Sequence, residues 1–218
     1  MKLYLHGGED IEKRDSKEIN EEAFANAGKS PTVLIFPWTA DVEKIEFRTV
    51  MCDYFKELGG GEIVFAELSD SFQKLKEKIE SSDMIYLPGG NPKILIDRIK
   101  ERKIDHLFQR YNKVIIGNSA GSLAMCKRYV VIKGQGGQPK TTTKGGVGKV
   151  DFEVTVHYKS AIPELSGRSP DRELKTLSRK MNIQIYAIPE RCALVYDNKK
   201  IKPIGDIYVF DNGKKTKL

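Results

Sequence analysis

The fold is decided by the stretch Lys113-Val114-Ile115-Ile116-Gly117-Asn118-Ser119-Ala120-Gly121-Ser122. A short apolar run ends in Gly-x-Ser-x-Gly, and a helical pattern follows from Leu123. This order predicts a strand, a sharp turn and a helix, with Ser119 at the apex of the turn. Glycines flank the serine because a side chain would clash in so tight a bend. Such a turn lifts the hydroxyl clear of the sheet and sets it beside backbone N–H groups that can stabilise negative charge.

The same alternation of apolar runs and helical patterns fills the chain before this turn. The patterns predict strands at 3–5, 32–36, 62–66, 84–87 and 114–116, and helices at 16–27, 42–58, 72–79 and from Pro92 onward. Repeated strand–helix units with right-handed crossovers favour an α/β fold. We therefore expect a three-layer, doubly wound, mostly parallel sheet with helices on both faces.

The pattern changes after Tyr129. Residues 133–149 are rich in Gly, Lys and Thr, and we interpret them as a long connection that is either functional or mobile. Strands are predicted again at 152–156, 184–188, 193–196 and 207–210, with one helix at about 170–180. Neither a linker-like composition nor an internal repeat divides the chain, so we expect one domain over 1–218.

Composition limits the classes of function. Of the 218 residues 39% are apolar and 31% are charged, the net charge is +7, and no run is long enough to cross a membrane. The three cysteines are odd in number and widely separated, which predicts reduced thiols in a cytoplasmic protein. Lysine clusters at 199–202 and 214–217 accompany no nucleic-acid motif, so we interpret them as solvated surface. We expect neither a nucleic-acid nor a membrane partner. The sequence is compatible with a homodimer.

A serine hydroxyl needs a neighbouring base to become a nucleophile, and the chain has three histidines. His157 ends the alternating run 152–156, and reactive crevices in open α/β sheets lie at the carboxyl ends of the strands. His157 is therefore the preferred partner of Ser119. His6, at the end of the first strand, is the second choice, and His106 lies in a helical stretch that would hold it in water.

The base in turn needs an acid that fixes its tautomer. Glu190 follows the apolar run 184–188 and is the preferred candidate, although its spacing is equally typical of a surface carboxylate in a turn. Asp171 and Glu173 are interpreted as solvated residues of a helix, and Asp206 precedes its strand. The order Ser119, His157, Glu190 differs from the order of nucleophile, acid and base in α/β-hydrolases.

Acyl transfer also needs donors for an oxyanion. The N–H of Ala120, directly after the serine, is one candidate. The glycine turn Leu87-Pro88-Gly89-Gly90-Asn91-Pro92 is the other, because backbone without side chains can approach a substrate closely. The same turn also suits a plain helix start, with Asn91 as the cap and Pro92 in the first turn, and both interpretations can hold.

Four segments together, 88–91, 117–121, 157–158 and 189–190, resemble in order and spacing the peptidase E (aspartyl dipeptidase) family of serine peptidases, whose relatives include cyanophycinase. The resemblance implies a fold like that of class I glutamine amidotransferases and cleavage of dipeptides with an N-terminal aspartate. It implies Ser119 as nucleophile, His157 as general base and Glu190 as orienting acid, with Gly90, Asn91 and Ala120 lining the oxyanion hole. Family members bind the substrate carboxylate through an arginine after the histidine, which makes Arg168 and Arg172 the candidates here.

Two other interpretations were weighed. The stretch Lys144-Gly145-Gly146-Val147-Gly148-Lys149 resembles a phosphate-binding loop, but Val150 stands where Ser or Thr should hold magnesium, and a strand pattern follows instead of a helix. A cyanophycinase-like or other small-amide hydrolase, or an inactive binding module of the same fold, is the alternative to a peptidase of small peptides. The sequence has no cluster of His, Cys and carboxylate residues at the spacing of metal ligands, so neither a metal nor a cofactor is expected.

Overall fold

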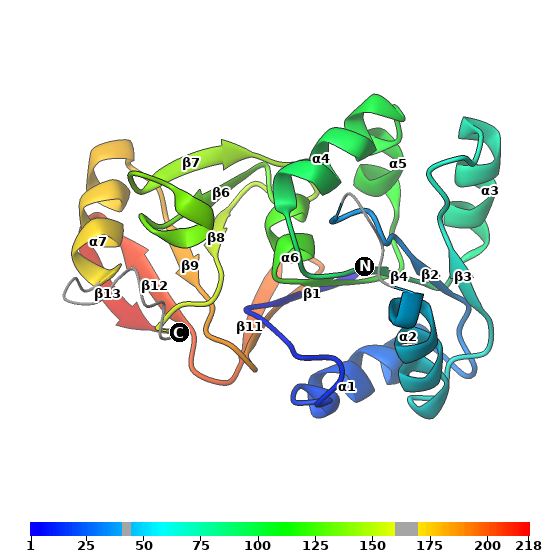
Figure 1. Cartoon of the computed structure of the whole chain (residues 1–218). Coiled ribbons are helices and arrows are strands. Elements are labelled where there is room, and N and C mark those ends of the chain that lie inside the picture. Colours follow the sequence, from blue (N-terminus) through cyan, green and yellow to red (C-terminus); the bar gives the residue numbers. More distant parts are fainter. Residues whose placement is uncertain (41–44, 160–169) are drawn as a thin grey trace.

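The structure, a computed structural model, describes residues 1–40, 45–159 and 170–218. Seven strands form the first sheet: β1 (Lys2–His6), β2 (Val33–Ile35), β3 (Ile63–Phe65), β4 (Met84–Leu87), β5 (Val114–Asn118), β10 (Ala193–Asp197) and β11 (Lys200–Ile204). Their order is β11-β10-β1-β5-β4-β2-β3 (Figure 1). The five strands from β1 to β3 in this order are parallel, and β10 and β11 add an antiparallel edge.

Helices cover both faces of this sheet because successive side chains of a strand point to opposite faces. Tyr4 packs on one face with α1 (Lys17–Ala27) and α2 (Ile45–Glu57). Leu3 and Leu5 pack on the other. That second face is covered by α3 (Phe72–Ser81), α4 (Pro92–Glu101), α5 (Asp105–Arg110) and α6 (Ala120–Met125) (Figure 1). The predicted three-layer, mostly parallel α/β fold is confirmed.

A second sheet lies beside the first. Its strands are β6 (Arg128–Val131), β7 (Thr142–Gly145), β8 (Glu153–Thr155), β9 (Ile185–Ala187), β12 (Tyr208–Asp211) and β13 (Lys214–Lys217). They are ordered β13-β12-β9-β8-β6-β7, and α7 (Pro170–Met181) packs on one face through Leu174 (Figure 1). The opposite face joins the core that covers the first sheet, so one apolar cluster connects the two sheets.

The prediction that 133–149 is a structureless connection was wrong. This segment holds a short 3₁₀ turn, η1 (Gln135–Gly137), and the strand β7. Among the described strands β7 pairs with β6 alone and forms an edge of the second sheet. An edge strand that is half exposed needs few apolar residues, which is why a Thr- and Lys-rich sequence can form one.

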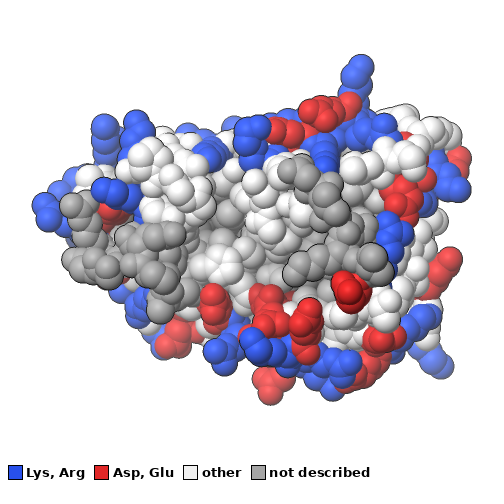
Figure 2. All heavy atoms as spheres, viewed as in Figure 1, with Lys and Arg blue, Asp and Glu red and all other residues white. Residues whose placement is uncertain are grey.

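The lysine clusters also belong to edge strands, since β11 and β13 end the two sheets. Figure 2 shows lysine and arginine spread around the outline of one face of the molecule, without a single large basic patch. None of the helices in the described ranges combines the length and the hydropathy that a membrane crossing requires. That the whole chain folds as one domain stays a prediction.

Candidate active site

The turn around Ser119 has the strained backbone that its glycines suggested. Ser119 has φ +47° and ψ −99°, a conformation that L-residues rarely adopt. A Cβ on Gly117 would lie 2.6 Å from the carbonyl carbon of Gly121, and a Cβ on Gly121 would lie 2.2 Å from the carbonyl oxygen of Leu87. Glycine at both positions therefore lets β5, α6 and β4 approach closely enough to form the turn.

Three predicted residues meet at this turn. Ser119 Oγ lies 2.6 Å from His157 Nε2, and His157 Nδ1 lies 3.2 Å from Glu190 Oε1. These distances let the hydroxyl give its proton to a ring nitrogen while the carboxylate accepts from the other ring nitrogen. The side chains of His157 and Glu190 are 36% and 48% exposed, so a small substrate can reach them from solvent.

His157 is held by backbone contacts rather than by a regular strand. It follows β8 with φ +53°, and its N–H donates to the carbonyl of Gly7 over 2.8 Å. Tyr158 is buried, and its N–H donates to the carbonyl of Ile188, just before Glu190. Segments after β1, β8 and β9 thus fix the imidazole beside the end of β5.

The oxyanion donors need one correction. The N–H of Asn91 donates to the carbonyl of Thr39 over 2.9 Å, and the Asn91 side chain caps α4 by accepting from Lys93 and Ile94. Asn91 is therefore a helix cap whose N–H is already used. Within the described ranges no acceptor pairs with the N–H of Gly90 or Ala120, so these two remain as donors.

The second-choice base does not reach the serine. His6 is fully buried, and neither ring nitrogen has a hydrogen-bond partner in the part of the chain that the structure describes. Burial lowers the pKa of His6 to about 3, so the ring is neutral at physiological pH. Its backbone carbonyl, however, accepts from the N–H of Ser119 and from the Ser122 hydroxyl.

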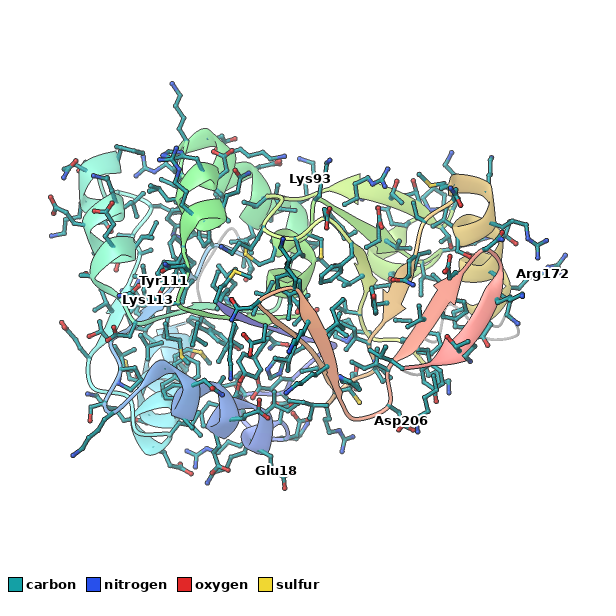
Figure 3. All side chains as sticks on the ribbon, turned by 180° about the vertical axis from the view of Figure 1, so that it is seen from behind. Glu18, Lys93, Tyr111, Lys113, Arg172 and Asp206 are labelled. Carbon is teal, nitrogen blue, oxygen red and sulfur yellow. The ribbon has the colours of Figure 1, made fainter. Side chains whose placement is uncertain are left out.

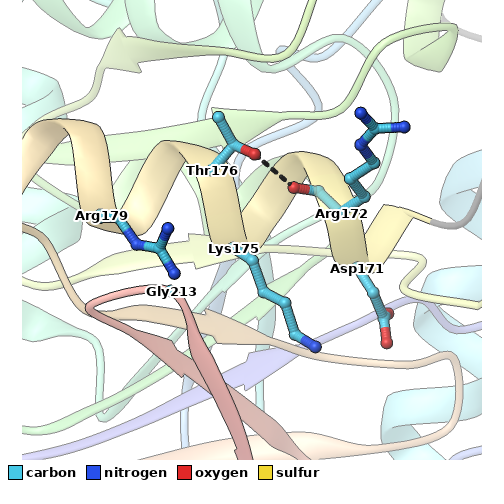
Figure 4. Close-up of a pocket in the computed structure, with 6 residues that line it drawn as sticks. All are labelled: Asp171, Arg172, Lys175, Thr176, Arg179 and Gly213. Atoms are coloured by element: carbon cyan, nitrogen blue, oxygen red, sulfur yellow. Dashed lines mark hydrogen bonds between the residues drawn. The ribbon is translucent and has the colours of Figure 1, made fainter.

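Of the two candidate arginines, the structure describes one. Arg168 lies outside the described residues. Arg172 is exposed at the outer end of the molecule (Figure 3), where it lines an open hollow of about 390 Å³ on α7 (Figure 4). The apolar side of α7, with Leu174, turns into the second sheet, and this leaves Arg172 on the outward side. The expectation that Arg172 meets a substrate carboxylate beside Ser119 finds no contact to support it.

Sequence reasoning also misjudged Asp171 and gave no role to the segment 7–9. Asp171 is not merely solvated, because it accepts from the hydroxyl of Tyr158, the neighbour of His157. Gly7, Gly8 and Glu9 follow β1 and contact the residues around the turn. Two glycines at the carboxyl end of a parallel strand were the available signal, because such ends line the crevice.

The segment that resembles a phosphate-binding loop is engaged elsewhere. The N–H groups of Gly146, Val147 and Gly148 donate to carbonyls of 124–127 at and after the end of α6. Lys149 Nζ donates to the carbonyls of Gln109 and Tyr111. The backbone N–H groups that would cradle a phosphate are therefore occupied. Among the described residues no group of three or more His, Cys, Asp or Glu is placed to hold a metal ion.

Comparison with known proteins identifies the family. The profile described as Peptidase family S51 matches residues 3–204. The chain belongs to peptidase family S51. It is a serine-type peptidase, and the resemblance to the peptidase E family seen in the sequence is confirmed.

The S51 peptidase is also similar to other proteins in sequence and fold. An uncharacterized peptidase of Listeria monocytogenes is 24% identical in an alignment 188 positions long, which covers 78% of this chain and 84% of that protein. The crystal structure of a peptidase from an acI-B1 actinobacterium has a TM-score of 0.72 at 17% identity and covers 100% of this chain and 93% of that one. A candidate peptidase E protein from L. monocytogenes has a TM-score of 0.66 at 20% identity, covering 93% and 97% of the two chains.

Proposed function

We propose that this S51 peptidase hydrolyses small peptides through an acyl-enzyme on Ser119. The observation that carries the proposal is the continuous contact from Ser119 Oγ through the His157 ring to Glu190, at 2.6 and 3.2 Å. The same residues are a serine nucleophile, a base and an acid in the order that the family resemblance implies. Their arrangement suits proton transfer from a hydroxyl to a neutral imidazole.

The reaction follows from this contact. Ser119 Oγ attacks the peptide carbonyl carbon while its proton passes to His157 Nε2. The N–H groups of Gly90 and Ala120 hold the oxygen that becomes negative. The proton then passes to the leaving amine as the C–N bond breaks. Water, deprotonated by His157, attacks the ester carbonyl carbon. The bond from that carbon to Ser119 Oγ breaks, the acid leaves, and His157 returns the proton to Oγ. Glu190 stabilises the ring while it is charged.

For the substrate we propose dipeptides with an N-terminal aspartate. This choice rests on the resemblance of 88–91, 117–121, 157–158 and 189–190 to peptidase E. Since the Arg172 side chain is exposed on the outward side of α7, we propose that the cation that meets the aspartate carboxylate comes from another position. Arg168 is the remaining candidate from the sequence.

A panel of dipeptides tests both parts. We expect hydrolysis of Asp-X in preference to Glu-X, Asn-X and Ala-X with the same second residue, and no hydrolysis by Ser119→Ala. Equal rates for all four peptides would refute the aspartate preference and leave the serine chemistry intact. Hydrolysis by Ser119→Ala at the wild-type rate would refute the chemistry itself.

A further inference from the structure

The segment His6–Glu9 contacts all three members of the proposed triad. The carbonyl of His6 accepts from the N–H of Ser119 over 3.2 Å, and the carbonyl of Gly7 accepts from the N–H of His157 over 2.8 Å. A Cβ on Gly8 would lie 2.6 Å from His157 Cε1 and 3.1 Å from Glu190 Cγ. A small displacement of this segment would therefore move the base relative to the nucleophile.

Glu9 ends the segment and binds the residue before the nucleophile. Its N–H donates to Asn118 Oδ1 over 3.0 Å, and its carbonyl accepts from Asn118 Nδ2 over 3.1 Å. Asn118 is the last residue of β5 and the immediate neighbour of Ser119. The backbone of Glu9 thus links the end of β1 to the nucleophile turn through two hydrogen bonds.

The Glu9 side chain is fully buried. Oε1 accepts from Asn20 on α1 and, over 3.4 Å, from the Tyr54 hydroxyl on α2. Among the described residues Oε2 has no hydrogen-bond partner, and it lies 3.7 Å from Nδ1 of the buried His6, which has none either. A proton on Oε2 would face a ring nitrogen that can accept, whereas a carboxylate would place a buried charge beside an uncharged ring.

The charges around Glu9 favour this neutral form. Asp10 and Asp15, on the loop that follows, add negative charge near the carboxyl. Within the described ranges neither Lys nor Arg forms an ion pair with it, and Arg14 instead stacks on the Tyr54 ring. The remaining neighbours, Asn20, Tyr54 and the buried Tyr86 of β4, are uncharged at neutral pH.

We propose that Glu9, held as a neutral acid beside His6, is a positioning residue. It fixes the segment His6–Glu9, whose contacts hold Ser119, His157 and Glu190 in place relative to one another. The proposal rests on the proposed function, because it concerns the alignment of that triad. When Glu9 loses its proton, a buried charge without a cationic partner draws water or moves, and the contacts of Gly7, Gly8 and Asn118 move with it. Burial raises the pKa of the Glu9 carboxyl to about 7, so the loss of this proton falls near neutral pH.

The test compares wild type with Glu9→Gln, which keeps an uncharged side chain of the same size, and with Glu9→Ala. Glu12→Gln is the matched control, since Glu12 is an exposed acid on the same loop. Two readouts are followed from pH 5.5 to 8.5: kcat/KM on Asp-X dipeptides and the rate at which a serine-directed phosphonate modifies Ser119. Far-ultraviolet circular dichroism at each pH confirms that every variant is folded.

For wild type and Glu12→Gln we expect an alkaline decline with a midpoint near pH 7 and a limiting slope of −1 in the logarithm of the rate. Glu9→Gln should lack this decline and keep the wild-type rate at pH 6 within about threefold, because the amide stays neutral. Glu9→Ala should lose tenfold or more at every pH. The rescue by Gln and the change in pH profile are effects that a purely structural role would not produce.

Superimposable pH profiles of wild type and Glu9→Gln would overturn the proposal, and so would a fully active Glu9→Ala. If Glu9→Ala does not fold, the pH profiles of wild type and Glu9→Gln still test the proposal. Failure of the proposed function has a different signature. In that case wild type at pH 6 neither hydrolyses the peptides nor reacts with the phosphonate at Ser119.

Discussion

Replacing Glu9 by Gln changes how folding stability depends on pH, and the structure gives both the sign and the size of that change. In the unfolded chain the carboxyl has its ordinary pKa of 4.5, whereas burial raises it to about 7 in the folded protein. Between these values the folded state holds a proton that the unfolded state has lost. Stability from this group is therefore complete below pH 4.5 and is lost as the pH rises to 7.

The magnitude follows from the shift. A rise of the Glu9 pKa from 4.5 to about 7, at ~1.36 kcal/mol per unit, corresponds to about 3 kcal/mol. His6 acts in the opposite direction, because its pKa falls from 6.5 to about 3 and the unfolded chain binds the extra proton. The two contributions cancel between pH 4.5 and 6.5 in the wild type. In Glu9→Gln only the His6 contribution is left, so stability rises over that range.

Urea unfolding of both proteins at pH 4.5, 5.5, 6.5 and 7.5 measures the effect. We expect the stability of Glu9→Gln relative to wild type to increase by about 3 kcal/mol from pH 4.5 to 7.5, with His6 cancelling in the difference. Glu12→Gln, in which an exposed carboxyl is replaced, should run nearly parallel to wild type. A difference between Glu9→Gln and wild type that stays constant over this range would refute the buried neutral acid.

Three further changes test the proposed triad. Ser119→Ala should lower turnover by ~10⁴-fold or more, measured as kcat on an Asp-X dipeptide, because the nucleophile is gone. Glu190→Gln should cost less than that, since the carboxylate is half exposed and orients the ring rather than attacking; wild-type activity in this variant would show the acid assignment to be wrong. Gly8→Ala places a methyl group 2.6 Å from His157 Cε1 and should lower kcat on the order of 10²-fold in a folded protein, whereas an unchanged kcat would mean that the ring position does not matter.

The sequence predicted the parts of the fold whose residues are buried on both sides. The run before Ser119 is apolar because β5 is central in the sheet, and the glycines at 117 and 121 show directly that backbones meet there. The edge strands gave a weaker signal. β11 and β13 are rich in lysine and read as solvated clusters, because an edge strand has one open side and does not need an apolar pattern.

In the candidate site, the sequence predicted the positions that depend on local patterns, and it missed those that depend on packing between distant segments. His157 and Glu190 follow predicted strands, so the rule that strand ends meet was enough to bring them to Ser119. The use of the Asn91 N–H by Thr39 and the outward position of Arg172 depend on packing between distant segments, which spacing does not encode. Glu9 was missed for the same reason, because a charged residue after two glycines reads as a turn until its burial is known.

The central claim, a Ser119 hydroxyl activated by His157, is tested most directly by mass spectrometry of the protein treated with a serine-directed phosphonate. We predict a single adduct on the peptide that contains Ser119, and a modification rate that falls sharply in His157→Ala while the protein stays folded. An adduct on a different serine, or an equal rate without the imidazole, would contradict the account.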